Sequence, residues 1–331
     1  MYEQYFGFRE EPFSLTPDPA FLYPSHQHGV AYSLLEYGVL QQAGFTVITG
    51  DAGCGKTTLI RRLIDELGLQ VTLGLLDNAH PRLSNLMEWV SMAFGLEYKS
   101  KDPVDLHDSF VQFLASEHRM RRRVILIIDE AQNLDPDTLE ELRTLSNINT
   151  GRHQVLQIIL VGQPELRDIL ARPELSQFSQ RVVSHYALKP LMESETLGYI
   201  VHRLTHAGGR PDLFTPEACR LIHRHSQGIP RLINLLCGTA LVYAFAEEAE
   251  QIGADIVQTV LNDGAAGLCM GAQAATSPVT RRRWTGTEPP EPAVERREEN
   301  RPQMAAPETA TRKFGVEDAR QLFSNLAKSK T

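Results

Sequence analysis

The glycine-rich segment GDAGCGKTT at positions 50–58 constrains the fold of this chain more than any other feature. It follows the apolar run FTVIT (45–49) and precedes the apolar pattern LIRRLI (59–64), so we expect a strand, a loop and a helix in that order. Its spacing matches G-x-x-x-x-G-K-[ST], a loop whose backbone amides cradle phosphate groups at the start of a helix. An ordinary glycine-rich turn is the alternative, but the order of strand, loop and helix favours a nucleotide phosphate site.

The residues of this segment have separate expected roles. Lys56 can reach the β- and γ-phosphates of a nucleotide, and the Thr57 hydroxyl suits a ligand of Mg²⁺. ATP and Mg²⁺ are therefore the expected cofactors. The rest of the predicted cradle consists of Gly50, Asp51, Ala52, Gly53, Cys54, Gly55 and Thr58.

A second apolar run, VILIID at 124–129, ends in the acidic pair Asp129 and Glu130. Asp129 at the end of a strand can complete the Mg²⁺ shell. Glu130, one residue further, is placed to polarise the attacking water as a general base. An acidic helix cap after a strand is the alternative, and the phosphate loop favours the catalytic interpretation.

The distribution of apolar residues divides the chain into three parts. Apolar runs at 71–76, 156–162 and 183–188 alternate with helical patterns, which predicts parallel strands with crossover helices up to Leu191. From Glu193 to about Leu261 the pattern is helical, and Ser194 and Thr215 are expected helix caps. Beyond Gly264 the composition shifts to Ala, Pro, Arg, Glu and Thr, which cannot bury enough apolar surface to fold alone.

Composition excludes several classes of function. The net charge of −8 gives no global basic field for nucleic acid, although a local basic patch is compatible with it. We find no signal peptide and no uninterrupted apolar run of the roughly 18 residues that a membrane helix needs. His202 and His206 have the spacing of zinc ligands on a helix, but no third ligand lies near them in the sequence.

The chain resembles the AAA+ ATPases of the ExeA/GspA type, which accompany type II secretion, pilus biogenesis and related envelope systems. The resemblance covers roughly residues 1–260, and the transposition ATPases of the TniB/TnsC type share its core motifs. The segments that carry it are YFGFREEPFSLTPDPAFLYPS, GDAGCGKTTL, IIDEAQNL, LRTLSNINT, LQIILVGQPEL and GIPRLIN.

The resemblance implies an α/β fold of the P-loop NTPase (AAA+) class, with a doubly wound, parallel five-stranded sheet followed by a small helical lid. The expected organisation is a leader with the first helix (1–44), the nucleotide-binding domain (45–191), the lid (192–264) and a disordered tail (265–331) with a short C-terminal helix. The implied function is that of an ATP-hydrolysing motor or switch for a secretion, pilus or other envelope assembly system. The alternative is a DNA-associated ATPase that regulates transposition.

The resemblance also implies three site residues outside the two motifs. Gln163 occupies the position of a polar sensor of the water or γ-phosphate, and Arg231 matches the lid arginine that reaches the γ-phosphate. Arg181 lies where an arginine finger enters the site of a neighbouring subunit, with Arg172 and Arg167 as alternatives. A homo-oligomer that assembles through Arg181 is therefore expected.

Two further expectations concern the ends of the chain. In the leader, Phe13, Leu15 and Tyr23 either line the adenine pocket or fill the core. Longer ExeA-type proteins continue into a transmembrane helix and a peptidoglycan-binding region, and this chain shows neither. We therefore expect a cytoplasmic protein without a membrane span, held at the inner membrane through a protein partner, with DNA a less favoured partner.

Overall fold

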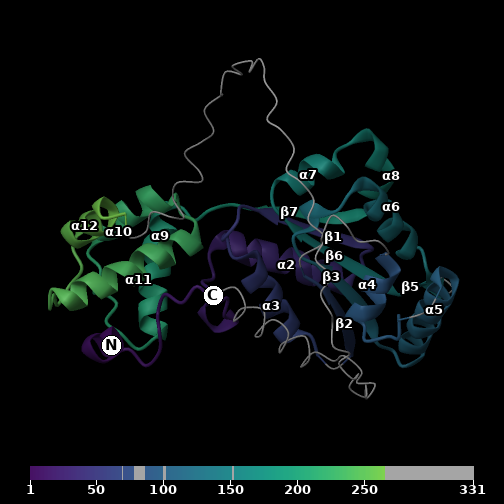
Figure 1. The fold of residues 1–331 in the computed structure, drawn as a ribbon, viewed down its shortest axis with the longest axis horizontal. Coiled ribbons are helices and arrows are strands. Elements are labelled where there is room, and N and C mark those ends of the chain that lie inside the picture. The colour runs from purple at the N-terminus through teal and green to yellow at the C-terminus, as the bar shows by residue number, and fades with distance from the viewer. Residues whose placement is uncertain (69, 78–85, 100–101, 151–152, 265–331) are drawn as a thin grey trace, which may run out of the picture.

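The computed structural model describes residues 1–68, 70–77, 86–99, 102–150 and 153–264. They form a unit built on a sheet and a smaller helical unit beside it (Figure 1). The predicted tail (265–331), with its short C-terminal helix, lies outside the described residues.

The larger unit contains a parallel five-stranded sheet in the order β2-β3-β6-β1-β7. The five predicted strands are confirmed, with small shifts of their ends. A short antiparallel pair, β4 and β5, lies outside this sheet. The strands are β1 (Phe45–Gly50), β2 (Val71–Leu76), β3 (Arg123–Ile128), β4 (Asn149–Thr150), β5 (His153–Gln154), β6 (Leu156–Gly162) and β7 (Val182–Leu188).

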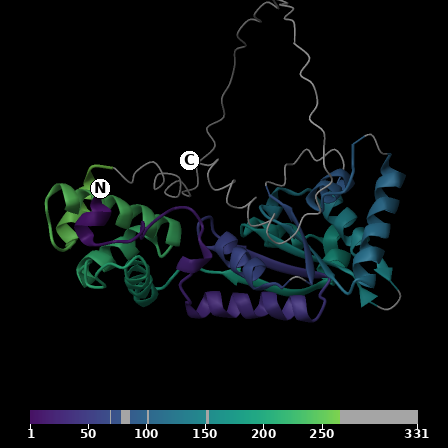
Figure 2. The same cartoon turned by 90° about the horizontal axis from the view of Figure 1, so that it is seen from below.

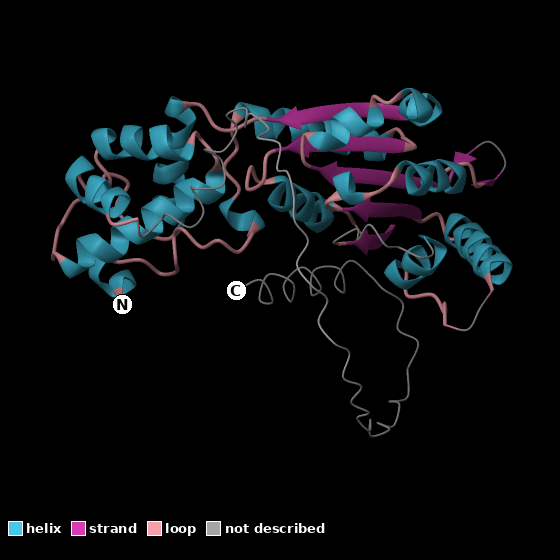
Figure 3. Cartoon of the chain, turned by 45° about the horizontal axis from the view of Figure 1, so that its top comes forward, coloured by secondary structure: helices cyan, strands magenta, loops and turns pink. Residues whose placement is uncertain are grey.

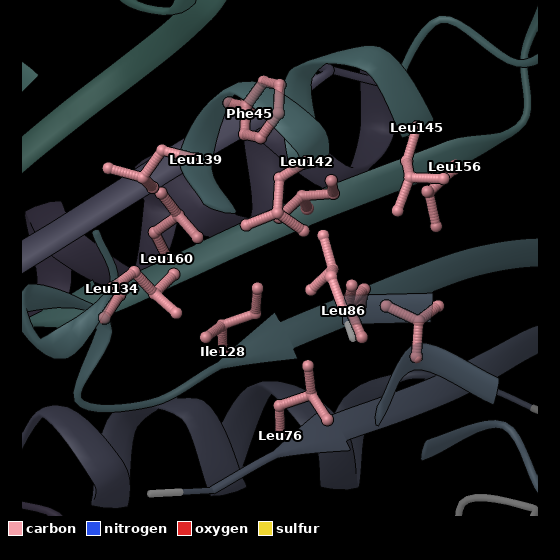
Figure 4. Packing of buried hydrophobic residues seen from close by; sticks show 14 of the residues in the cluster. Phe45, Leu76, Leu86, Ile128, Leu134, Leu139, Leu142, Leu145, Leu156 and Leu160 are labelled. Atoms are coloured by element: carbon pink, nitrogen blue, oxygen red, sulfur yellow. The ribbon is translucent and has the colours of Figure 1, made fainter. Parts of the chain in front are cut away.

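Helices cover both faces of the central strands β1, β3 and β6, which explains why these are apolar almost throughout, whereas alternate residues of the edge strand β7 are exposed. Neighbouring β1 residues point to opposite faces, so Val47 packs into one hydrophobic cluster and Ile48 into the other. Figure 4 shows the first cluster, in which Leu139 and Leu142 face Leu160 of β6. Figure 2 shows α2 along the opposite face. The covering helices are α2 (His26–Leu40) and α3 (Lys56–Glu66) on one face, and α4 (Leu86–Ala93), α5 (Pro103–Arg119), α6 (Pro136–Leu145), α7 (Glu165–Leu170) and α8 (Ser176–Ser179) on the other.

The smaller unit is a helical lid with its own hydrophobic core. Thr215 caps α10 as expected, because its side chain accepts a hydrogen bond from the Ala218 N–H. The expected cap at Ser194 is wrong: α9 begins at Glu193, so Ser194 lies in its first turn, and the Glu195 carboxylate accepts the N–H of the N-cap residue Met192 at 3.0 Å. The lid helices are α9 (Glu193–His206), α10 (Pro216–Ser226), α11 (Pro230–Ala246) and α12 (Ala254–Asn262).

The N-terminal leader packs on the lid, although the sheet unit lies between the two in the sequence. Phe8, Phe13 and Phe21 belong to the hydrophobic core of the lid. The buried Arg203 of α9 donates hydrogen bonds to the carbonyls of Pro12 and Ser14. The leader contains α1 (Tyr2–Phe6) and the 3₁₀ turn η1 (Pro19–Phe21); further 3₁₀ turns are η2 (Ala131–Asn133) and η3 (Pro173–Leu175). The segment predicted as 1–44 is thus divided, because the leader packs on the lid and α2 packs on the sheet.

Replacing Phe13 with alanine is expected to lower the free energy of unfolding by about 3–5 kcal/mol, because the ring is 2% exposed and leaves a cavity. Its ring also meets that of Phe214 edge-on at 5.9 Å, so the leader and the lid would loosen together. Urea unfolding followed by circular dichroism measures the loss. Leu40→Ala is the control: Leu40 is 60% exposed, and its replacement should change stability by less than about 0.5 kcal/mol. Equal losses in the two variants would contradict this packing.

Candidate functional site

The predicted site residues meet at one edge of the sheet. The glycine-rich loop follows β1, Asp129 follows β3, and Gln163 follows β6, which lies between those two strands. In parallel sheets, ligands bind beyond the carboxyl ends of the strands. These ends point towards the lid (Figure 3). The topology therefore brings together three chain segments that are far apart in the sequence.

A cavity of about 330 Å³ opens at this edge, and three parts of the chain line it. The sheet unit contributes Gly53, Gly55, Lys56, Thr57, Asp129 and Glu130; the leader contributes Ser14, Leu15, Leu22 and Tyr23; and the lid contributes Leu191, Tyr199, Arg203, Arg231 and Asn234. Of the leader residues left open by the sequence, Leu15 and Tyr23 line the cavity, whereas Phe13 lies in the lid core. The cavity thus lies between the sheet unit, the leader and the lid.

Donors from three helices bind carbonyl oxygens of the loop. Lys56, at the start of α3, donates from Nζ to the carbonyls of Gly50 at 2.6 Å and Asp51 at 3.0 Å. The Arg231 N–H of α11 donates to the Gly53 carbonyl at 3.2 Å, and His28 Nε2 of α2 lies 3.0 Å from the Cys54 carbonyl. Because these bonds use carbonyls, they hold the loop without engaging its N–H groups, of which that of Cys54 donates to the Asp51 carbonyl at 3.2 Å.

The glycine at position 53 is required by the lid. Its φ is +84°, and a Cβ there would lie 2.6 Å from the Cβ of Arg231. A side chain would therefore push α11 away from the loop. The lid turn has a matching requirement at Gly228, whose φ is +75° and whose Cβ would lie 1.9 Å from the Leu191 carbonyl. Two glycines thus allow the lid to approach the phosphate loop.

His28 contributes to the site, although we did not predict it. It is 5% exposed, and its Nδ1 lies 2.8 Å from the Ser25 hydroxyl. Because a carbonyl can only accept, Nε2 carries the proton and donates to Cys54, so Nδ1 accepts from Ser25. Burial lowers the pKa of His28 below its ordinary value, and the bond to Cys54 opposes this effect. The neutral ring therefore ties α2 to the loop.

Thr57 and Asp129, the two predicted Mg²⁺ ligands, lie side by side in the wall of the cavity. The Thr57 hydroxyl donates to Asp129 Oδ2 at 3.2 Å. Burial raises the pKa of Asp129, and the nearby carboxylates of Glu130 and Asp77 raise it further. Within the described residues, no cluster of three or more His, Cys, Asp or Glu side chains could hold a metal. Two oxygen ligands fit Mg²⁺, because it binds proteins through one or two side chains and takes its other ligands from phosphates and water.

Glu130, the residue after Asp129, accepts hydrogen bonds from two side-chain amides. Gln132 Nε2 donates to Glu130 Oε2 at 2.7 Å, and Gln163 Nε2 donates to the same oxygen at 3.3 Å. The predicted base and the predicted sensor are therefore in direct contact. Gln132 was not among the predicted site residues, although it lies in the same IIDEAQNL segment.

The two predicted arginines lie in different places. Arg231 lines the cavity beside the loop, at the start of α11. Arg181 is exposed between α8 and β7, the edge strand, and does not line the cavity. Within the described part of the chain, Arg181 makes no ion pair, whereas Arg172 pairs with Glu174 at 3.6 Å and Arg167 with Asp168 at 3.1 Å. The role of Arg181 as an arginine finger for a neighbouring subunit stays a prediction.

The fold and the motifs together are those of the P-loop NTPase (AAA+) class. A family model described as "AAA domain" matches residues 39–170, and the fold of this class is a nucleotide-binding one. No helix among the described residues has the length and apolar character needed to span a bilayer.

Among curated proteins, "General secretion pathway protein A" of Aeromonas hydrophila is 39% identical over 253 residues. The match covers 76% of this chain and 46% of that protein, so the chain spans about half the length of this relative. The resemblance to the ExeA/GspA type is thereby confirmed.

Solved structures with the same fold include two ORC proteins and a Walker-type ATPase. The ORC2 protein of Aeropyrum pernix matches with a TM-score of 0.59 and 17% identity, covering 77% of this chain and 72% of that one. The ORC1 protein of the same organism matches with a TM-score of 0.58 and 17% identity, over 77% and 69% of the two chains. A Walker-type ATPase of Pyrococcus abyssi matches with a TM-score of 0.52 and 16% identity, over 80% and 78%. At these identities the likeness concerns the fold alone.

His28→Phe is expected to lower the stability of the nucleotide-free protein at pH 7.5 by about 1–3 kcal/mol, because the buried Cys54 carbonyl loses its donor. The difference in the free energy of unfolding between His28→Phe and the wild type should become smaller as the pH falls. Since the folded pKa of His28 is depressed, the unfolded chain binds more protons below about pH 6.5, and the wild type loses stability there. Urea unfolding between pH 7.5 and 5.5 measures this, with the exposed His225→Phe as control. If the free energies of unfolding of His28→Phe and the wild type changed with pH in parallel, the depressed pKa of the buried His28 would be contradicted.

Proposed function

We propose that this chain binds ATP with Mg²⁺ and hydrolyses it at the cavity between the sheet unit and the lid. The observation that carries this proposal is the convergence of Lys56, Thr57, Asp129 and Glu130 at the end of the glycine-rich loop, with Arg231 beside them. The loop amides and Lys56 would bind the phosphates. Leu15 and Tyr23 of the leader would lie against the base, where they line the remainder of the cavity.

The residues of the site divide the work of hydrolysis among them. Thr57 and Asp129 would hold Mg²⁺, which neutralises negative charge on the β- and γ-phosphates when bound. Glu130 takes a proton from the attacking water as general base. Gln163 contacts Glu130 and orients the water or the γ-phosphate, and Arg231 stabilises negative charge on the γ-phosphate from the lid. The short distance between Gln163 and Glu130 supports this division.

Hydrolysis would require a second copy of the chain. Arg181 is exposed and lies outside its own cavity, which suits a guanidinium that acts on the nucleotide of a neighbouring subunit. The chain would thus form a homo-oligomer in which each site is completed by the next subunit. Arg172 and Arg167 are less suited, because each already pairs with a carboxylate.

We infer that the ATPase serves as a conformational motor or switch for a secretion, pilus or other envelope assembly system, through a protein partner. The relative named for the general secretion pathway supports this role. The likeness to the ORC proteins concerns the fold alone and does not favour the alternative of a DNA-associated regulator of transposition. A measurement distinguishes the assembly role from the DNA-associated role: duplex DNA should stimulate hydrolysis in a salt-sensitive way only in the DNA-associated role.

Glu130→Gln is expected to retain ATP binding and to lower turnover by about 100-fold or more, because the amide keeps the size of the side chain and cannot accept the proton. Lys56→Ala is the matched comparison, since it should remove binding itself. Titration with a fluorescent ATP analogue and release of phosphate measure the two effects separately. Near-normal turnover in Glu130→Gln would exclude this residue as the base, and unchanged affinity in Lys56→Ala would contradict the phosphate site.

Arg181→Ala is expected to bind ATP nearly normally and to hydrolyse it roughly 1,000-fold more slowly, the value of an arginine finger in related phosphoryl transfers. Mixing this variant with Lys56→Ala should restore part of the activity, because some interfaces then pair an intact loop with an intact finger. Turnover per subunit should also rise with protein concentration. Arg172→Ala and Arg167→Ala are the comparison variants. If specific activity did not change with protein concentration, and if the mixture of the two variants regained no activity, assembly through Arg181 would be contradicted.

A further inference from the structure

The side-chain amide of Gln132 joins the carboxyl ends of two neighbouring strands. Gln132 lies in η2, the turn that follows β3, and its Oε1 accepts the backbone N–H of Gln163, the residue after β6, at 2.9 Å. Its Nε2 donates to Glu130 Oε2 at 2.7 Å. A backbone N–H can only donate and an ionised carboxylate can only accept, so the orientation of the amide follows from its two partners. One rigid amide therefore holds the base and the sensor together.

The surrounding backbone is built around this amide. A Cβ at Gly162 would lie 3.0 Å from Gln132 Oε1 and 2.8 Å from a methyl group of Leu166, so glycine leaves the room that the amide occupies. Ala131, which precedes Gln132, is completely buried and anchors the turn. Glu130 has a φ of +54°, a conformation that residues with side chains rarely adopt and that its surroundings have to maintain.

We propose that Gln132 is a positioning residue for ATP hydrolysis, which holds the Glu130 carboxylate in register with Gln163. This inference rests on the proposed role of Glu130 as general base. Gln132 does not touch the reacting atoms itself. Its two bonds connect the residue that takes the proton with the residue that contacts the water or the γ-phosphate, so a change at Gln132 displaces both groups at once.

Substitutions that remove one or both hydrogen bonds of the Gln132 amide distinguish a positioning role from that of a residue that only fills space in the turn. Gln132→Glu keeps the oxygen that accepts the Gln163 N–H, but it replaces the donor to Glu130 with a second carboxylate. Gln132→Met has a similar size and loses both bonds. Asn133→Ala is the control within the same turn, because Asn133 is exposed and donates no side-chain hydrogen bond among the described residues.

The test measures turnover and nucleotide affinity for these variants of the full chain. We expect both Gln132 variants to lower kcat by roughly 10- to 100-fold, since small displacements of catalytic groups have effects of this size. Gln132→Glu should be the slower of the two because the carboxylates repel each other. Affinity for a fluorescent ATP analogue should change by less than about threefold, since the phosphate-binding groups are unaltered. Asn133→Ala should match the wild type.

A second measurement is independent of activity. Gln132→Glu should lower the thermal midpoint, and the double variant Glu130→Gln/Gln132→Glu should recover it towards that of Glu130→Gln, because the amide and the carboxylate have exchanged places. A residue that served only to accept the Gln163 N–H would leave the midpoint of Gln132→Glu unchanged.

The outcomes distinguish failure of this inference from failure of the proposed function. If Glu130→Gln stops turnover while both Gln132 variants keep kcat within twofold of the wild type, the positioning role is overturned and the general base stands. If Glu130→Gln retains turnover, the general base falls, and with it the catalytic role of Gln132. Loss of ATP affinity in parallel with kcat, or a double variant no more stable than Gln132→Glu, would also overturn the inference.

Discussion

The structure depends on holding a phosphate loop by its carbonyls, so that its amides can face an anion. The loop is a turn of glycines and small residues, and such a turn has little structure of its own. Its shape comes from Lys56 of α3, His28 of α2 and the Arg231 N–H of α11, which bind the carbonyls of Gly50, Asp51, Cys54 and Gly53. One of these three helices belongs to the lid. The geometry of the phosphate site is therefore tied to the position of the lid from the outset.

The leader extends this connection. Arg61 of α3 donates to the Pro17 carbonyl, while Arg203 and Asn234 of the lid donate to the Ser14 carbonyl. The leader thus crosses from the lid to the phosphate-loop helix and forms one wall of the cavity on the way. Because its aromatic residues are buried in the lid core, movement of the lid would carry this wall with it. This arrangement provides a physical link between nucleotide at the site and the orientation of the lid.

Much of the fold was predictable from local sequence. The strands covered on both faces are apolar runs, and the loop, Asp129 and Glu130 stand at the ends of such runs. The contributions of His28 and Gln132 were not predictable in this way, because each residue binds a partner that is distant in the sequence. His28 binds the Cys54 carbonyl, and Gln132 accepts the Gln163 N–H. The expected cap at Ser194 was wrong, because α9 begins at Glu193 and Ser194 lies inside its first turn. Glu195 accepts the N–H of Met192, the N-cap residue, from within the helix.

The sequence by itself determined the class of fold and the place of the glycine-rich loop in it, because periodicity and glycine spacing are local properties of the chain. Only the tertiary structure decided how the site is enclosed. Strand order placed β6 between β1 and β3 and so brought Gln163 against Glu130. The same structure buried Phe13 in the lid core, left Leu15 half exposed at the wall of the cavity, and placed Tyr23 between the lid core and the cavity. All three are apolar or aromatic residues of one short segment, so residue type alone did not decide which of them is buried; that depends on where distant segments of the chain meet.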